Sequence, residues 1–104
     1  MNPAGMRFRK VHSIISRPVG EEIVIVPTEG KGSELKKIYA ISGSGVRMWE
    51  LIDGRNSLEA IRDILLAEYD VAPQRLEKDL AALVESLLRK NFIEPVIAGR
   101  KGGR

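Results

Sequence analysis

Residues 38–93 read IYAISGSGVRMWELIDGRNSLEAIRDILLAEYDVAPQRLEKDLAALVESLLRKNFI, and this segment is the most informative about the fold. Its pattern predicts a short strand followed by three helices, because apolar residues recur at helical spacing between clear turn signals. The apolar stripes of these helices leave few positions for an active site. The stretch therefore predicts a compact body that acts by holding another molecule.

Polar residues, glycine and proline mark the ends of the three predicted helices. Ser42 is expected to cap a first helix that begins at residue 43 or 44 and stops at Asp53 and Gly54. Ser57 caps the second helix, and Ala72–Pro73 opens the third, which Asn91 ends. The apolar stripes expected to form the core are Val46, Trp49 and Ile52, then Leu58, Ile61, Leu65 and Tyr69, and finally Leu76, Leu80, Leu83, Val84, Leu87 and Leu88.

Runs of β-branched residues before the helices predict a three-stranded antiparallel meander, with strands near 13–19, 22–27 and 36–41. Residues 23–26 (IVIV) are apolar on both alternating faces, so the second strand should be central or covered on both sides. Lys36 and Lys37 stand near the start of the third strand, and lysines of this kind protect exposed strand edges. We therefore expect the third strand to be an edge. The predicted class is α+β, a winged helix-turn-helix-like body with a three-stranded antiparallel sheet followed by three helices.

Length and composition restrict the class of protein. A chain of 104 residues fits one domain, and the absence of cysteine excludes disulfides and thiolate metal sites and suits a cytoplasmic protein. No apolar run approaches the roughly 20 residues that span a bilayer, and the basic N-terminus lacks the apolar core of a signal peptide. We expect a cytoplasmic domain with no membrane association.

The net charge of +3 comes from the ends of the chain. Seven of the 17 basic residues lie in residues 1–17 and 95–104, which contain no acid, so ten basic residues oppose 14 acidic ones between them. A surface that follows a phosphate backbone needs its basic residues on the folded face, so this distribution does not favour nucleic acid. We expect a flexible basic arm over residues 1–10, a folded domain over 11–94 and a flexible basic tail over 95–104.

Catalytic, metal and cofactor sites find little support in the sequence. His12 is the one histidine and has no cysteine beside it, so an ordinary zinc site is not expected. Acidic pairs such as Glu50 with Asp53 arise on any solvated helix face. Trp49 belongs to an apolar stripe, and the SGSG at 42–45 lacks the lysine of a phosphate-binding loop. We predict no enzymatic activity, no catalytic residue, no metal and no cofactor.

Several short motifs in fixed order resemble the PqqD family, which is named for pyrroloquinoline quinone (PQQ) biosynthesis. They are the pair Ile41–Ser42 opening a helix, ELIDG at 50–54, SLEAI at 57–61, Tyr69–Asp70–Val71, and LEKDLAALVESLLRKNFI at 76–93. The likeness covers most of residues 14–94. The chain departs from the family pattern in the first helix, where Gly43 and Gly45 replace bulkier residues at a cost of about 0.5–1 kcal/mol each if fully helical.

The resemblance implies a peptide-recognition element of pathways that modify ribosomally made peptides. Such domains bind the leader segment of a precursor peptide and present it to a modifying enzyme, often a radical S-adenosylmethionine enzyme. The leader is added as a strand to the exposed third strand, in a groove walled by the third helix. The residues this assigns to peptide binding are Lys37, Ile38, Tyr39, Ala40 and Ile41 on the strand, and Arg75, Lys78, Asp79, Ala82 and Ser86 on the helix.

Other interpretations remain open for these residues. Ala82 and Ser86 can be small residues packed against the sheet, and Asp79 can pair locally with Arg75. A winged helix can also bind DNA, with Gln74, Arg75 and Lys78 at the start of the third helix as readers of the major groove. A third possibility is an adaptor without a peptide ligand, a monomer or a homodimer paired through its strand edge.

Overall fold

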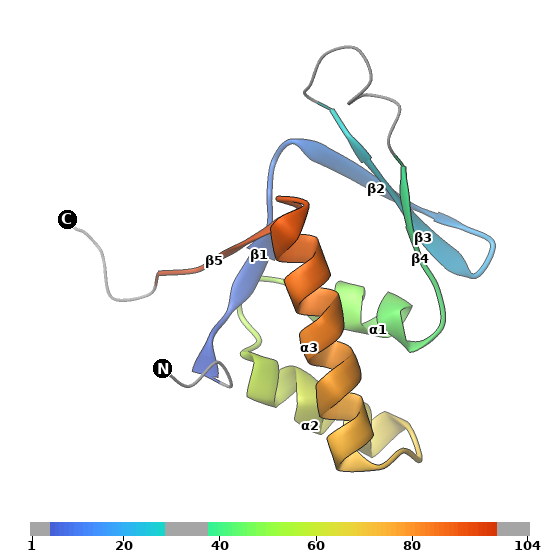
Figure 1. The fold of residues 1–104 in the computed structure, drawn as a ribbon, viewed down its shortest axis with the longest axis vertical. Coiled ribbons are helices and arrows are strands. Elements are labelled where there is room, and N and C mark those ends of the chain that lie inside the picture. The colour runs from blue at the N-terminus through green and yellow to red at the C-terminus, as the bar shows by residue number, and fades with distance from the viewer. Residues whose placement is uncertain (1–4, 29–37, 98–104) are drawn as a thin grey trace.

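The computed structural model of the chain describes residues 5–28 and 38–97, which form five strands and three helices (Figure 1). The strands are β1 Phe8–Lys10, β2 Ile14–Val19, β3 Glu22–Pro27, β4 Tyr39–Ile41 and β5 Ile93–Pro95. The helices are α1 Ser44–Leu51, α2 Leu58–Glu68 and α3 Pro73–Arg89. The predicted α+β class, with a three-stranded sheet followed by three helices, is confirmed.

The sheet has the strand order β2-β3-β4, and both pairs are antiparallel. β4 is an edge strand, as predicted; it begins at Tyr39, and Lys36 and Lys37 lie outside the described residues. Opposite residues of paired strands point to the same face, so Ile25 and Tyr39 share the face that meets the helices. Ile25 is fully buried there.

β3 is the central strand of the sheet, which confirms one of the two predicted alternatives. The other alternative, cover on both sides, does not apply to the described residues, because Val24 and Val26 are only half-buried. Ile15 pairs with Val26 across this face and is 50% exposed. The continuous apolar run in β3 therefore reflects one buried face and one largely open face.

A two-stranded sheet of β1 and β5 is the element that the sequence did not predict. The expected flexible arm over residues 1–10 is wrong for residues 5–10, because Phe8 is only 4% exposed and β1 pairs antiparallel with β5. The amide of Gly54 donates to the Phe8 carbonyl at 2.8 Å, and that of Leu58 donates to the Met6 carbonyl at 2.9 Å. The N-terminal segment is therefore part of the domain.

The basic residues of β1 are engaged within the fold. Arg9 Nε lies 2.7 Å from Glu94 Oε2, and Lys10 Nζ lies 4.6 Å from the centre of the Trp49 ring. Burial lowers the pKa of Lys10, against the smaller opposing effects of Asp53 and Glu50.

The expected C-terminal tail also begins too early. Pro95 belongs to β5, and the amide of Val96 donates to the Arg7 carbonyl at 2.9 Å. Residues 98–104 lie outside the described residues, as do residues 1–4.

Two of the three helices begin at the predicted N-terminal signals. The Ser57 hydroxyl accepts from the Ala60 amide at 3.1 Å and caps α2, and Pro73 opens α3. The predicted Ser42 cap of α1 is wrong: Gly43 is the N-cap, with φ of 62°, and no side chain caps this helix. A positive φ is readily accessible to glycine, which explains why Gly43 can occupy the N-cap position.

The end of α3 is built from two backbone hydrogen bonds. Asn91 has a φ of 63°, its amide donates to the Leu88 carbonyl, and the Phe92 amide donates to the Leu87 carbonyl, each at 3.0 Å. This is the Schellman arrangement, in which an asparagine takes the left-handed position that glycine usually holds. The turn directs Phe92 and Ile93 back onto the core, where they are 7% and 2% exposed.

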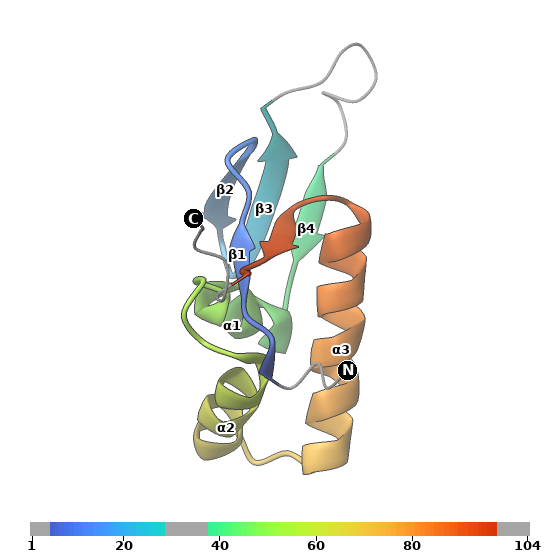
Figure 2. The ribbon, with the colours of Figure 1, turned by 90° about the vertical axis from the view of Figure 1, so that its left-hand side faces the viewer.

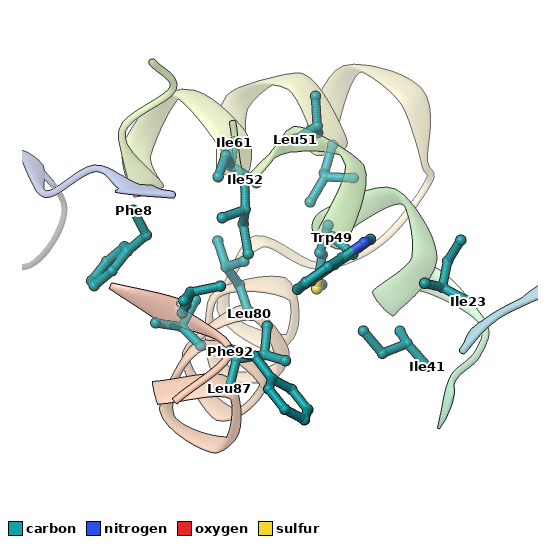
Figure 3. Packing of buried hydrophobic residues seen from close by; sticks show 14 of the residues in the cluster. Phe8, Ile23, Ile41, Trp49, Leu51, Ile52, Ile61, Leu80, Leu87 and Phe92 are labelled. Carbon is teal, nitrogen blue, oxygen red and sulfur yellow. The ribbon is translucent and has the colours of Figure 1, made fainter. Parts of the chain in front are cut away.

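The core joins all three helices to the inner face of the sheet and to β1 and β5 (Figure 3). Trp49 is 3% exposed, which confirms it as a core residue, and the stripe of α3 is buried as predicted at four positions: Leu76, Leu80, Val84 and Leu87. Tyr69 is the exception among the predicted stripes, because it is 43% exposed just beyond the end of α2. None of the helices in residues 5–28 and 38–97 has the length and apolarity needed to cross a lipid bilayer.

Candidate functional site

The free edge of β4 lies beside α3 (Figure 2). β4 pairs with β3 through Ile23↔Ile41, Val24↔Ala40 and Ile25↔Tyr39, and no described strand covers its other side. An uncovered edge presents unpaired amides and carbonyls that can bond another strand. Among the predicted edge residues, Ala40 is exposed on the open face of the sheet, Ile38 is exposed just before β4, and Lys37 lies outside the described residues.

Tyr39 is the residue that connects this edge to the helix. Its hydroxyl lies 3.4 Å from the Ser86 hydroxyl, and its ring centre lies 6.0 Å from that of Phe92. The Lys90 ammonium stands 5.0 Å from the centre of the Tyr39 ring. Residues more than 40 positions apart in the sequence thus meet at one end of β4.

The floor of the site is formed where α1 begins. A side chain at Gly45 would place its first carbon 2.8 Å from Ile41 Cγ2 and 3.9 Å from Leu83 Cδ2. Gly45 therefore allows α1 to pack tightly against β4, and it leaves Ile41 4% exposed. The glycine that departs from the family pattern has a packing reason at this point.

The side of α3 that faces β4 differs in part from the predicted face. Leu83, Ser86 and Lys90 are on that side, as their contacts with the Gly45 region and Tyr39 require, and Asp79 continues the same spacing of four, three and four residues. We call these four residues, together with Tyr39–Ile41, the edge site. Of the predicted helix residues, Ser86 contacts Tyr39 directly, and Asp79 is included by its position on the same side of the helix.

The remaining predicted helix residues are exposed. Arg75 Nε lies 3.9 Å from Asp79 Oδ2, so the local pairing that was left open is present. Ala82 and Lys78 are exposed as well. Among the described residues, no hydrogen bond, ion pair or ring contact links Arg75, Lys78 or Ala82 to β4, so their role in peptide binding stays a prediction.

Lys90 and Leu83 were missed as site residues by the sequence reasoning. Their signal was present, because the series 79, 83, 86 and 90 follows one side of a helix as regularly as the predicted series 75, 79, 82 and 86. The position of Tyr39 relative to α3 distinguishes the two series, and it is not visible in the sequence.

The acidic side chains outside the edge site form no metal site in the described residues, and Asp53 has a structural role. The Asp53 carboxylate accepts from the amides of Asn56 and Arg55, each at 2.9 Å, and these hydrogen bonds lower the pKa of Asp53. Asp53 thus closes the turn between α1 and α2, where Gly54 has a φ of 85°. Within residues 5–28 and 38–97 no three His, Asp or Glu side chains cluster as metal ligands would.

One open cavity of about 420 Å³ lies at the connection of β1 to β2 and the turn after α3. His12 is one of its lining residues, and no member of the edge site lines it. The six lining residues are Val11, His12, Ser13, Asn91, Ile93 and Glu94.

Comparisons with known proteins identify relatives of this fold. TbiB1, solved in complex with the TbiA(beta) leader peptide, is 22% identical, with a TM-score of 0.69 over 89% of this chain and 98% of that chain. The heterocyclase TruD is 10% identical, with a TM-score of 0.60 over 92% of this chain and 12% of that chain. No curated protein sequence matches the chain.

The comparison with protein families matches the region that contains the edge site. The family described as Coenzyme PQQ synthesis protein D (PqqD) matches residues 22–93, from β3 to the start of β5. The match includes β4 and α3, which form the edge site, and it agrees with the motifs at residues 41–93. This chain belongs to the PqqD family.

Proposed function

We propose that the protein binds the leader segment of a ribosomally made precursor peptide and presents it to a modifying enzyme. The observation that carries the proposal is the free edge of β4 beside α3. An added strand would gain backbone hydrogen bonds from β4, and the neighbouring helix would select side chains. TbiB1, which shares the fold, is a protein solved with a leader peptide, and TruD, which contains a similar region, is a modifying enzyme, a heterocyclase.

The two edges of the sheet are not equivalent as docking sites. β2 is the other edge, but it contains Pro18, which has no amide, and five of its six residues are exposed with no helix in hydrogen-bonding contact. β4 is shorter, so its few backbone bonds must be supplemented by side-chain contacts, and α3 is positioned to supply them. The β4 edge is therefore the better site for a specific peptide.

The proposed activity is binding without catalysis, in the cytoplasm. The acidic group of the edge site, Asp79, is engaged in an ion pair with Arg75. The partner enzyme that fits this role best is a radical S-adenosylmethionine enzyme, as the family resemblance implies. No observation favours DNA binding: among the residues predicted to read the major groove, Arg75 lies 3.9 Å from the carboxylate of Asp79.

Titration with synthetic segments of short peptides encoded beside the gene tests the proposal. We expect micromolar binding, with amide shifts in β4 and on the side of α3 that carries Ser86. Methylating the backbone nitrogens of the bound peptide one at a time should weaken binding at every second residue, because alternate amides of a strand point to the same neighbour. Equal losses at every position, or shifts confined to β2, would refute strand addition on β4.

A matched pair of variants tests the site from the protein side. Ser86→Arg places a long side chain between α3 and β4, and Ala81→Arg places the same side chain on an exposed part of α3 that does not face β4. We expect the first variant to lose peptide affinity at least tenfold and the second to retain it. Circular dichroism should show both to be folded.

A further inference from the structure

Lys90 is the feature of the edge site that the strand-addition proposal leaves without a role. Its ammonium lies 5.0 Å from the Tyr39 ring centre and takes part in no ion pair among the described residues. The neighbouring Arg89 is different, because its guanidinium lies 3.1 Å from Glu85 at a spacing typical of a helix surface.

The end of α3 does not require the ammonium either. The carbonyls of Ser86, Leu87 and Leu88 already accept from the amides of Lys90, Phe92 and Asn91. A lysine near a helix C-terminus often bonds such carbonyls, but here each has a backbone donor. The cation is thus held over an aromatic ring at one end of a free strand edge.

The positive and negative charges along this side of α3 do not balance. Asp79 lies at 3.9 Å from Arg75, so that pair is neutral, and Leu83 and Ser86 carry no charge. Lys90 therefore leaves one net positive charge at the Tyr39 end of the described part of the edge site.

We propose that the edge site selects peptides that carry an acidic side chain at the position beside Tyr39, where it pairs with Lys90; this inference rests on the proposed function. A strand added to β4 would lie about 4.8 Å away, and its residue opposite Tyr39 would point to the same face as the Tyr39 ring. An aspartate or glutamate at that position reaches the ammonium of Lys90. The contact fixes the register of the peptide, because a slip by one residue turns the carboxylate to the open face of the sheet.

The experiment is selection of random twelve-residue peptides displayed against the full chain. Three forms serve as bait: the wild type, Lys90→Glu, and Arg89→Glu as a control with the same change of charge one residue away. Only peptides that fail to bind the Ser86→Arg variant are counted, so that each counted peptide uses the edge site.

We expect aspartate or glutamate to be enriched at one position in peptides selected by the wild type and by Arg89→Glu. With Lys90→Glu the same position should change to lysine or arginine. Replacing the acidic residue of one selected peptide by its amide should weaken wild-type binding about two- to fivefold, the range of an exposed ion pair, and high salt should remove the difference. Lys90→Gln, which keeps the length of the side chain, should bind both peptides equally.

Two results would overturn the inference while strand addition stands: peptides that use the edge site without a charge preference, or the same acidic preference in Lys90→Glu. A selection that yields no peptide dependent on Ser86 contradicts the proposed function itself.

Discussion

At the scale of single residues, Gly45 shows how one missing side chain shapes the site. An added carbon would lie 2.8 Å from Ile41 Cγ2, and Ile41 is buried and β-branched, so it has little freedom to move. We predict that Gly45→Ala lowers the free energy of unfolding by about 1–2 kcal/mol, because the strain outweighs the gain in helix propensity.

Urea denaturation measures this effect, with Ser44→Ala as control. Ser44 is exposed in the same first turn of α1, so its replacement should change stability by less than about 0.5 kcal/mol. A Gly45→Ala protein as stable as the wild type would show that α1 does not pack against β4 as described.

Asp53 makes the stability of the turn between α1 and α2 dependent on pH. Hydrogen bonds from the amides of Asn56 and Arg55 hold the pKa of Asp53 below its ordinary value. A carboxylate with a lowered folded-state pKa stabilises the fold above its unfolded pKa of about 3.9, and the contribution is lost as the pH falls through the folded value.

We therefore predict that Asp53→Asn destabilises the protein at pH 7 by about 1 kcal/mol, since the carboxylate is exposed and its bonds are screened. The difference between wild type and variant should shrink as the pH falls below about 4, as measured by urea unfolding at several pH values. If the difference stays constant as the pH falls, Asp53 does not contribute to the pH dependence of the free energy of unfolding.

At the scale of elements, β1 extends the domain beyond the meander and the helices. Phe8 lies in the core with 4% exposure, whereas the neighbouring Arg9 is exposed and forms an ion pair with Glu94. We predict that Phe8→Ala lowers the free energy of unfolding by about 3–5 kcal/mol, the usual cost of deleting a buried aromatic side chain. Arg9→Ala should cost less than about 1 kcal/mol. Thermal unfolding of the two variants makes the comparison. If Phe8→Ala is as stable as Arg9→Ala, residues 5–10 are a flexible arm and not part of the core.

The elements differ in how well the sequence predicts them. The ranges of β2, β3, α2 and α3 follow from periodicity and from Ser57 and Pro73, which act through contacts within a few residues. β1 and β5 are only three residues long, and their partners stand about 85 positions apart, so no local pattern marks them. Phe8, a single aromatic among basic residues, gave no sign that its neighbours would form a strand.

The candidate site was predictable to a similar extent. The strand edge follows from the order of the meander, and Ser86 follows from helical spacing. The rotation of α3 about its axis relative to β4 does not follow from either, since it depends on packing of the whole core. For that reason helical spacing alone does not identify Leu83 and Lys90 as the residues of α3 near Gly45 and Tyr39.

At the scale of the whole molecule, the edge site depends on parts that are distant in the sequence. β4 supplies the edge, α1 closes one end of it through Gly45, and the turn after α3 brings Phe92 against Tyr39. The described fold therefore places one strand edge beside a helix and leaves the other, β2, without such a neighbour. This asymmetry is the basis for expecting one peptide site per chain.

Nuclear Overhauser contacts between the backbone protons of a bound peptide and those of the protein measure strand addition directly. Strand addition on β4 predicts a ladder of contacts from the peptide backbone to Tyr39–Ile41, accompanied by side-chain contacts to Ser86 and Lys90. A ladder to Ile14–Val19, or contacts with α3 alone and none to the backbone of β4, would contradict it.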